Sequence, residues 1–450
     1  MGRFTQRLGL LVCLSVGSAP ALADDLLSIL ELAMNNDPTL RQAEAQYMSR
    51  HTQLDQGRAA LLPSVALSGN TTRQTSGIPG EMSFRPGQNS HGYRLSLSQA
   101  VFNLSAWYAY QSAKQSDQAG AISFAAQEQN LIIRVATAYF DVLSAIDNLT
   151  TRRQEEEAAQ RQFEQTRQRE EVGLIAITEV YESQAAYDLA RNNTILAEDA
   201  LASGYEALEA ITGQPHPNLE VLREDFPIVN ADGTVESWTA QAMDSNLALA
   251  AARYNLEAQR FNLKARKADH LPTIALQAGF NHNVTAGSQS ADGSQRFAGA
   301  IDGTSLALTI NVPLYSGGGV QARRRAAEYD VVAQQEALSL TRRQTTQDVR
   351  NAFRRVNTDA LVISQRQQAI TSAQSALDAI EVGYEVGTRN IVDVLQARQQ
   401  LFIALRNYSD AKYNYVIDTL LLKQITGLLT PQDIIDLNQW LEEQPATAAP

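Results

Sequence analysis

The sequence predicts an α+β membrane protein in which very long α-helices carry a small sheet of membrane β-strands, four strands per chain. Three observations lead to this fold class. The chain begins with an export signal, most of the remaining sequence is written twice, and each copy contains a proline-free stretch of more than a hundred residues.

Residues 1–23 have the features of a secretory signal peptide. Two arginines precede a short apolar run at 8–16, and Ala21-Leu22-Ala23 forms a small-residue cleavage site. The run is shorter than the roughly 20 apolar residues of a membrane-spanning helix. We therefore expect the mature chain to begin at Asp24, outside the cytoplasm. Cys13 is the only cysteine, so its removal would exclude disulfides, thiolate metal sites and cysteine nucleophiles.

The chain is acidic, with 37 Lys and Arg residues against 49 Asp and Glu residues and a net charge of −12. An acidic exported protein would repel a phosphate backbone, so we expect no nucleic-acid partner. No later segment has the apolar length of a transmembrane helix. If the protein enters a membrane, it must do so as β-strands.

An internal repeat organises the sequence. Val172-Gly173 matches Val386-Gly387, and Ile211-Thr212-Gly213 matches Ile425-Thr426-Gly427, both at an offset of 214 residues. Earlier in the chain, Leu62-Pro63 matches Leu271-Pro272 at an offset of 209. Each copy therefore has the same order: a leading helix, a Leu-Pro boundary, two strands around a polar loop, and a long helical stretch.

These observations divide the chain into five parts. We expect a signal peptide at 1–23, a first repeat at 24–213, a linker segment at 214–244, a second repeat at 245–427 and a C-terminal tail at 428–450. In the first repeat, strands are predicted at about 64–73 and 92–101 and long helices at 104–171 and 174–212. In the second repeat, strands are predicted at about 273–284 and 303–312 and long helices at 319–386 and 388–426.

The predicted strands alternate between apolar and polar residues with a period of two. The apolar positions are Ile274, Leu276, Ala278 and Phe280 in one strand and Leu306, Leu308, Ile310 and Val312 in the next. Each segment has about the 9–11 residues that a tilted membrane strand needs, and a barrel wall alternates in this way. A half-buried soluble sheet also alternates, so the pattern alone leaves both structures open.

The helical stretches favour the membrane channel. The first is rich in Ala, Gln, Glu and Arg, which form helices well. About 67 residues at 1.5 Å each give a rod of about 100 Å, longer than any compact domain. Gly173 and Gly387 supply the positive φ that ends a helix, so each copy should fold back as a helical hairpin. The 3/4 spacing of apolar residues after Gly387 is typical of coiled-coil packing.

Four strands per chain are too few to close a barrel, and an open sheet edge in lipid is not viable. The chain must therefore oligomerise if its strands lie in a membrane. Three protomers would supply twelve strands, an even number within the range of known barrels. The strands alone do not fix the number at three.

Six sequence stretches carry a resemblance to a known family. They are ATAYFDVLSAIDNL at 136–149, VGLIAIT at 172–178, HLPT at 270–273, PLYSGG at 313–318, VGTRNIVDVL at 386–395 and YNYVI at 413–417. Together, the chain from Asp24 to about Trp440 resembles the TolC family of bacterial outer-membrane channel and efflux proteins. The resemblance implies a homotrimer with a twelve-stranded β-barrel, a long α-helical coiled-coil tunnel in the periplasm, and a location in the cell outer membrane.

The resemblance also implies partners and a domain built from leftover segments. The segments 24–36, 214–244 and 428–450 would form an equatorial region around the tunnel. A periplasmic adaptor (membrane fusion) protein and an inner-membrane transporter of the RND, MFS or ABC type would dock to the tunnel. The trimer would then serve as the exit duct for multidrug efflux, type I protein secretion or both.

In this family polar links between the helical hairpins hold the tunnel entrance shut. The resemblance places those links here at Gln168, Thr178, Glu179, Tyr384 and Arg389. It places Asp393 at a constriction, where three carboxylates would favour cations. The family has a second aspartate one turn on, where this sequence has Gln396, which predicts weaker cation selectivity. Without the resemblance, these residues read as solvated charges at helix ends.

No catalytic, metal or cofactor motif stands out. The histidines His51, His91, His216, His270 and His282 are scattered, and Gly317-Gly318-Gly319 lacks the Lys-Ser/Thr of a phosphate loop. The acidic run 155–157 reads as a solvated helix face. We therefore expect no catalytic residue, no metal, no cofactor and no enzymatic activity. The alternatives are a trimeric coiled-coil surface structural protein or adhesin, and a periplasmic coiled-coil adaptor or cell-envelope hydrolase.

Overall fold

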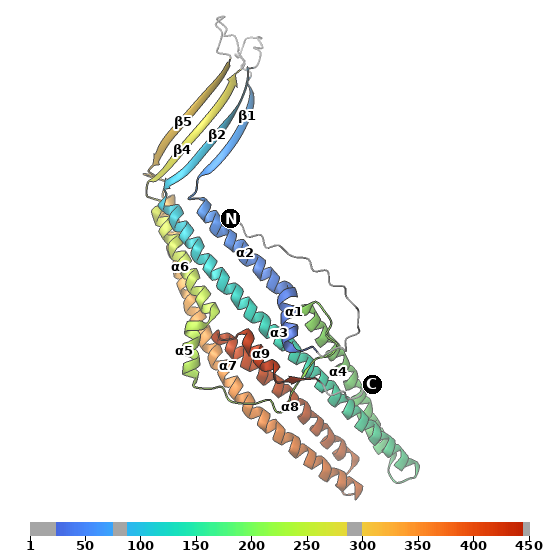
Figure 1. Ribbon diagram of the computed structural model, residues 1–450. Helices are drawn as coiled ribbons and strands as arrows, with labels where there is room; N and C mark the ends of the chain where they lie inside the picture. The colour runs from blue at the N-terminus through green and yellow to red at the C-terminus, as the bar shows by residue number, and fades with distance from the viewer. Residues whose placement is uncertain (1–23, 75–87, 286–298, 444–450) are drawn as a thin grey trace.

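The computed structural model of the chain describes residues 24–74, 88–285 and 299–443. The molecule is elongated, with a sheet at one end and long helices running from the sheet to the opposite end (Figure 1). The predicted signal peptide, 1–23, and the last part of the predicted tail, 444–450, lie outside the described residues. None of the described helices has a stretch long and apolar enough to cross a membrane.

The elements follow the repeat. The helices are α1 (Leu26–Asn36), α2 (Pro38–Ala59), α3 (Leu104–Glu171), α4 (Ile177–Thr212), α5 (Val235–Ser245), α6 (Leu247–Ala268), α7 (Gly319–Glu385), α8 (Ile391–Thr426) and α9 (Pro431–Asn438). The strands are β1 (Ser64–Gln74), β2 (Gln88–Phe102), β3 (Val221–Leu222), β4 (Thr273–Thr285), β5 (Gly299–Asn311) and β6 (Leu441–Glu442). Each repeat thus contributes one leading helix, two long strands and one helical hairpin.

The four long strands form one antiparallel sheet in the order β1-β2-β4-β5. Strands β2 and β5 each begin four residues earlier than the sequence predicts, at Gln88 and Gly299. Apart from Ile301, these added residues are polar or small, so alternation does not reveal them, but the ladder pairs Gln88 with Gln74 and Gly299 with Thr285. Within the described residues, β1 and β5 are the two edges of this sheet.

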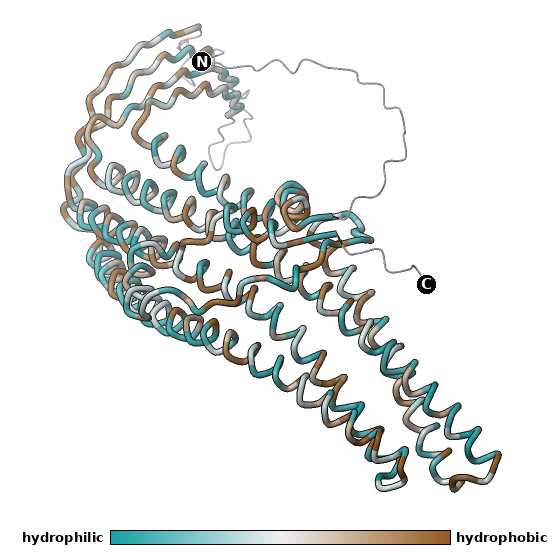
Figure 2. Tube along the Cα trace, turned by 60° about the horizontal axis from the view of Figure 1, so that its bottom comes forward, coloured by the Kyte–Doolittle hydropathy of each residue, from teal (hydrophilic) through white to brown (hydrophobic). Residues whose placement is uncertain are grey.

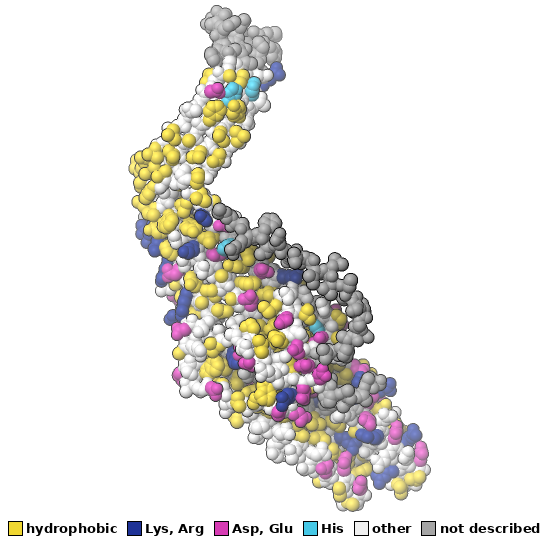
Figure 3. Space-filling model, viewed as in Figure 1, with side chains coloured by type: hydrophobic (Ala, Val, Ile, Leu, Met, Phe, Trp, Pro, Cys, Tyr) yellow, Lys and Arg dark blue, Asp and Glu magenta, His cyan; other side chains and the backbone are white. Residues whose placement is uncertain are grey.

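The two faces of the sheet differ in chemistry. Residues that pair across an antiparallel ladder share a face. One row across the four strands is Val65, Leu97, Ala278 and Leu306, and the next row, on the opposite face, is Ala66, Ser96, Gly279 and Ser305. The apolar face is open in the single chain, since Leu306 is 74% exposed and Val65 is 65% exposed. Figure 3 shows this face as a nearly continuous hydrophobic surface.

Capping side chains and turn glycines define the ends of the long helices. The side chain of Asn103 accepts a hydrogen bond from Ala106 N–H (3.0 Å) and so caps α3 at its start. Helices α4 and α8 begin three residues later than predicted, at Ile177 and Ile391. The prediction was wrong there because each turn takes five residues, 172–176 and 386–390, where the sequence predicted two and one. Figure 2 shows hydrophobic and hydrophilic positions alternating along each rod, as expected for helices that pack on one side.

The main hydrophobic core lies midway along the rods. Tyr139 and Phe140 of α3 are fully buried there and meet edge to face at 5.5 Å. The segments 24–36, 214–244 and 428–443 gather around this core. Strand β3 pairs with β6, and the Asn438 amide donates to the Asp25 carboxylate at 2.8 Å. These contacts between chain segments more than 200 residues apart make the middle of the molecule its most tightly packed part.

The two helix-ending glycines Gly213 and Gly427 offer a matched test of this packing. They occupy equivalent repeat positions, and both have φ of +76°. A methyl group on Gly427 would overlap the Ser245 carbonyl, whereas the nearest atom to one on Gly213 is the Asn36 Cβ at 3.9 Å. Gly213→Ala should cost only the left-handed backbone penalty, about 1 kcal/mol. Gly427→Ala adds steric overlap and should cost about 3 kcal/mol or more.

Thermal unfolding of the purified protein measures this difference. We expect Gly427→Ala to lower the unfolding temperature clearly more than Gly213→Ala. Equal losses in the two variants would show that the close approach of α8 to the α5–α6 junction carries no stability.

Candidate functional site

The candidate site lies at the far ends of the rods, where each hairpin turns. Both turns have the same backbone design, with Gly173 at φ +74° and Gly387 at φ +78°. Two backbone hydrogen bonds close each turn. In the first turn, Gly173 N–H donates to the Glu170 carbonyl (2.7 Å) and Leu174 N–H to the Arg169 carbonyl (2.9 Å). In the second turn, Gly387 N–H donates to the Tyr384 carbonyl (3.0 Å) and Thr388 N–H to the Gly383 carbonyl (2.8 Å). This pairing satisfies the last carbonyls of a helix and fixes the direction of the turn. Gly173 and Gly387 thus lie at the two hairpin turns, where the sequence places them.

The helices that leave the turns start differently. In α8, Asp393 N–H donates to the Asn390 side chain (2.9 Å) while Asn390 N–H donates back to the Asp393 carboxylate (3.4 Å). This capping box fixes the position of Asp393 on the first turn. Glu179 occupies the equivalent position of α4, but Ala176 there supplies no side-chain cap. The carboxylate of Glu179 is thus free to reach the second hairpin.

Tyr384 joins the two hairpins. Its hydroxyl donates to the Glu179 carboxylate at 3.3 Å, across 205 residues of sequence. The guanidinium of Arg169 lies over the Tyr384 ring, 5.5 Å from its centre. Burial and the Glu179 charge raise the pKa of Tyr384, and Arg169 opposes them, so the phenol stays protonated and able to donate. No sequence pattern indicates Arg169, because a cation placed over an aromatic ring has no fixed spacing in the chain.

A cavity of about 590 Å³ separates the hairpins beside this link. Gln168 lines it together with Tyr384 and Glu381. On the same cavity, Arg398 pairs with Glu381 at 2.5 Å and also donates to the Ala158 carbonyl at 3.2 Å. The tip is therefore held by polar contacts around a cavity rather than by a packed apolar core.

The remaining predicted gate residues lie on the outside of the tip. Arg389 is exposed in the turn before α8, and its guanidinium lies 3.8 Å from the Asp393 carboxylate on the first turn of that helix. Among the described residues this is the ion pair that Arg389 makes, and it is not one with Glu179. Thr178 and Gln396 are both exposed. The structure thus brings Tyr384, Glu179 and Gln168 together and leaves Arg389, Thr178 and Gln396 facing outward.

Above the tip, α8 is tied to α3 by charged groups. Arg406 and Arg152 both contact one Glu155 oxygen, at 3.1 Å and 3.0 Å. Burial and the neighbouring Arg152 charge lower the pKa of Arg406, and Glu155 opposes them. The interpretation of 155–157 as a solvated face was wrong for Glu155, whose side chain is largely buried between the two guanidinium groups. Helix period alone could not show that α8 lies over this residue.

Two further links continue the contact between α3 and α8 toward the core. The Tyr413 hydroxyl donates to Asp147 at 2.9 Å, and the Ser144 hydroxyl donates to Asp410 at 2.8 Å. Inside the second hairpin, by contrast, α7 and α8 meet through apolar side chains such as Leu377 and Leu401. The α7–α8 hairpin therefore has an apolar seam of its own near the tip, and several polar links join it to α3.

Two carboxyl groups face each other between α7 and α8. One oxygen of Asp359 is buried without a hydrogen-bond partner, and it lies against Asp418, whose side chain pairs with Arg355 at 3.3 Å. Two carboxylates cannot bond each other, but one shared proton supplies the missing bond. Burial, then the Asp418 carboxylate, raises the pKa of Asp359 to about 6, while Arg355 and Arg366 act in the opposite direction.

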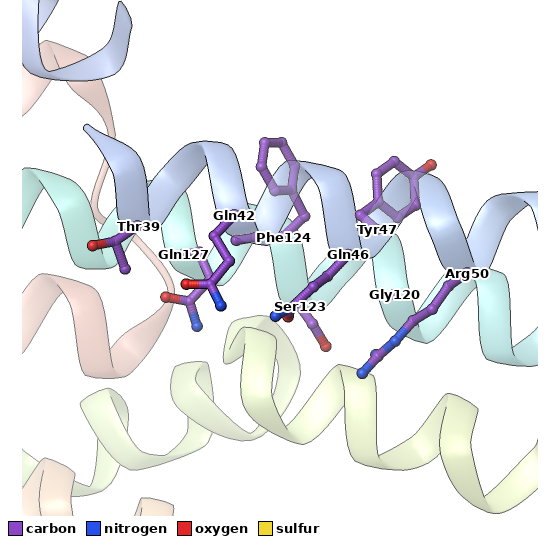
Figure 4. Close-up of a pocket in the computed structure, with 10 residues that line it drawn as sticks. Thr39, Gln42, Gln46, Tyr47, Arg50, Gly120, Ser123, Phe124 and Gln127 are labelled. Atoms are coloured by element: carbon purple, nitrogen blue, oxygen red, sulfur yellow. The ribbon is translucent and has the colours of Figure 1, made fainter. Parts of the chain in front are cut away.

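A groove of about 350 Å³ runs between α2 and α3, nearer the sheet. Figure 4 shows Gln42, Gln46 and Arg50 on one side of the two helices, while the rings of Tyr47 and Phe124 point the other way. These rings stack at 5.9 Å and hold the helices together. None of the ten residues that line the groove is Asp, Glu, His or Cys, so the groove offers amides and one guanidinium but no acid–base pair.

One buried cluster has the residue types of a hydrolytic triad. His216 lies 2.8 Å from Asp24 through Nδ1 and 2.9 Å from the Thr212 hydroxyl through Nε2. Thr212 is fully buried, however, and its hydroxyl lies within bonding distance of the Leu208 and Gln214 carbonyls. The cluster therefore ties Asp24 to the end of α4. No group of three or more His, Cys, Asp or Glu side chains that could hold a metal occurs among the residues described.

The fold and the site together define a class of protein. A fragment of membrane sheet with two open edges continues into two helical hairpins, and polar residues close the hairpin ends. The chain belongs to the outer membrane efflux protein family, whose pattern matches residues 29–214 and 238–428. This membership places the protein in the outer membrane.

Individual relatives cover nearly the whole chain. The outer membrane protein TolC of Vibrio cholerae is 37% identical over 94% of this chain and 95% of its own length. The proteases secretion protein PrtF of Dickeya chrysanthemi is 27% identical over 97% of this chain and 95% of its own length. The crystal structure of CusC matches with a TM-score of 0.77 at 18% identity, covering 94% of this chain and 99% of CusC. The predicted fold class, a TolC-like chain that contributes four strands and long coiled-coil helices, is confirmed.

The Asp359–Asp418 pair should make stability depend on pH. The folded state raises the Asp359 pKa from 3.8 to about 6, so it binds a proton that the unfolded chain releases. The stabilisation is complete below pH 4 and is lost as pH rises through about 6. We expect the unfolding temperature to fall between pH 5 and pH 7.5, and this fall to shrink in Asp418→Asn, whose amide donates without a shared proton.

The control is Asp378→Asn, which changes an exposed aspartate on α7, the helix that carries Asp359. This variant should keep the full pH dependence. An Asp418→Asn variant with the same pH profile as the unsubstituted protein would show that the two carboxyls share no proton.

Proposed function

We propose that three copies of this chain form a gated outer-membrane duct that carries cargo out of the cell. The observation that carries the proposal is the four-stranded sheet with an apolar face and, within the described residues, two open edges. In lipid each unpaired backbone group costs several kcal/mol, so β1 of one copy must pair with β5 of the next. Three copies give twelve strands, which close a barrel around the polar faces of the sheets.

The duct serves multidrug efflux, type I protein secretion or both. The family name supports efflux, and the relative PrtF is named for protease secretion. The helical tunnel would extend into the periplasm and meet an adaptor protein and an inner-membrane transporter. The protein would then be a passive conduit and not an enzyme, since the energy for transport comes from the partner pump. Neither drug efflux nor secretion is favoured by a residue of this site.

The polar contacts at the tip suit a gate. The Tyr384–Glu179 link is partly exposed and is worth about 1 kcal/mol, and three copies of the chain would repeat it around the entrance. Arg389 and Thr178 face outward, where a neighbouring protomer would lie, so we assign them to links between chains. Weak links repeated in this way hold a tip closed yet break together when a partner binds.

A trimeric surface adhesin is the second candidate, because long coiled coils suit both functions. An adhesin would place its barrel strands at one end of the sequence, whereas here each repeat contributes two strands to one sheet. Ion conduction in planar bilayers separates the two, since an adhesin stalk passes no ions through its helical part.

Removing the tip links should open the duct. We expect the double variant Tyr384→Phe/Arg389→Ser to raise single-channel conductance several-fold, because both the link within the chain and the one between chains are lost. Planar-bilayer recording measures the conductance. The control is Tyr181→Phe, which removes the hydroxyl of an exposed tyrosine on α4. Conductance that stays at the level of the control would remove these residues from the gate.

Charge at Asp393 should set ion preference. Asp393→Asn keeps an acceptor for the capping box but removes the carboxylate, so we expect cation preference to fall while the protein stays folded. Reversal potentials across a salt gradient report the change, and Asp378→Asn should leave them where they are. Potentials that do not move in Asp393→Asn would exclude a carboxylate ring at this position.

A further inference from the structure

The apolar face of the sheet changes character at the end farthest from the helices. There it carries five residues that we call the rim cluster: Arg73, His91, Tyr93, His282 and Asp302. The register places all five on the same face as the apolar rows, since Tyr93 pairs with His282 and His282 pairs with Asp302. His91 lies two residues before Tyr93 and pairs with Thr71, and Arg73 lies two residues after Thr71. Figure 3 shows basic, histidine and acidic side chains gathered at this end, above the hydrophobic surface.

Two contacts hold the centre of the rim cluster in place. His282 Nδ1 lies 2.5 Å from the Asp302 carboxylate, and the Tyr93 ring stacks on the imidazole with centres 5.0 Å apart. Because Asp302 occupies Nδ1, the opposite ring nitrogen, Nε2, points away from it. The aromatic pair also covers apolar surface next to Phe280, whose ring lies 6.1 Å from Tyr93.

The basic groups lie on a diagonal across three strands. From Arg73 on β1 to His91 on β2, and from His91 to His282 on β4, each step crosses one strand and two residues on the same face. With strands about 4.8 Å apart and about 3.4 Å per residue, each step is about 8 Å. Long side chains can bridge this spacing to one anionic group. Asp302, the one acid of the cluster, is already engaged by His282.

We propose that the rim cluster binds a phosphate group on the head group of an outer-leaflet membrane lipid. The inference rests on the proposed function, which puts the apolar face against lipid and this end of the strands at the outer surface. Acyl chains would then lie along Leu95, Phe280 and Leu306, and the phosphate would lie level with Arg73 and His91. An arginine can give a phosphate two parallel hydrogen bonds, and anionic head groups attract such basic groups beside a membrane span.

A matched control exists on the same sheet. Arg94 lies next to Tyr93 on β2, and its side chain is therefore on the opposite, polar face. Two variants are compared, the double variant Arg73→Gln/His91→Gln and the single variant Arg94→Gln. Each removes one guanidinium from the sheet, but only the double variant removes donors on the face proposed to contact lipid. Both arginines are exposed, so the substitutions leave the core intact, and Arg73→Lys keeps the charge at the rim.

The test measures lipid binding to the full-length protein in detergent by native mass spectrometry. The probes are a bis-phosphorylated glucosamine-disaccharide lipid and the same lipid after enzymatic removal of its phosphates. We expect Arg73→Gln/His91→Gln to weaken binding of the phosphorylated lipid about tenfold, with no effect on the dephosphorylated lipid. Arg94→Gln should bind like the unsubstituted protein, and Arg73→Lys should retain most of the affinity.

Three results would overturn the proposal. They are equal binding of the two lipids, an equal loss in Arg94→Gln, and binding of inorganic phosphate as tight as that of the lipid, which would make the cluster a free-anion site. Single-channel conductance of Arg73→Gln/His91→Gln should match that of the unsubstituted protein. A protein that forms no channels but still distinguishes the two lipids would contradict the duct and leave the lipid site standing.

Discussion

The structure depends on one constraint: backbone N–H and C=O groups cannot stay unpaired in lipid. In the part of the chain that the structure describes, four long strands form the sheet, and four strands leave two edges. A soluble protein could cover such edges with a loop or with charged side chains. Here both edges carry apolar residues on the outward face, such as Val65 on β1 and Leu306 on β5, so the edges must be paired by further strands in the membrane. The proposal of identical neighbours therefore rests on hydrogen bonding rather than on any particular interface residue.

Each of the two repeats contributes two strands to the sheet, and the repeats differ in the contacts they make at the tip. Both copies keep the same strand pair and the same glycine-ended hairpin, because those parts build the wall. The contacts at the tip differ: Asp393 is held in a capping box, while its counterpart Glu179 reaches across to Tyr384. The glycines that end α4 and α8 have equal φ angles but different surroundings. The two repeats thus have similar strands and helices, and single side chains such as Glu179 and Tyr384 form the contacts between them.

The sequence predicts the parts of this fold that local chemistry decides. Proline-free composition and the Asn103 cap define α3, which spans the residues expected for it, and alternation locates all four strands. It misses what depends on the packing of distant segments. Glu155 reads as solvated until α8 places Arg406 over it. Asp359 and Asp418 are 59 residues apart in the chain, and only the packed hairpin shows that they share a buried space. At the tip, spacing and resemblance select Tyr384 and Glu179, but Arg169 emerges only from three-dimensional contact.

The types of contact differ between the interior of the α7–α8 hairpin and its boundary with α3. Within the α7–α8 hairpin, Leu377 and Leu401 pack in an apolar seam that cannot be replaced by water without loss of buried surface. Toward the core, Phe140 of α3 and Tyr413 of α8 stack with their ring centres 5.9 Å apart. Nearer the tip, the contacts between that hairpin and α3 include hydrogen bonds and ion pairs, such as Arg406–Glu155 and the bond from Arg398 to the Ala158 carbonyl. Water can replace each of these at a net cost of about 1–3 kcal/mol. Separation therefore costs least along the boundary between the two repeats, and the tip, where the links are most exposed, is the place where separation would begin.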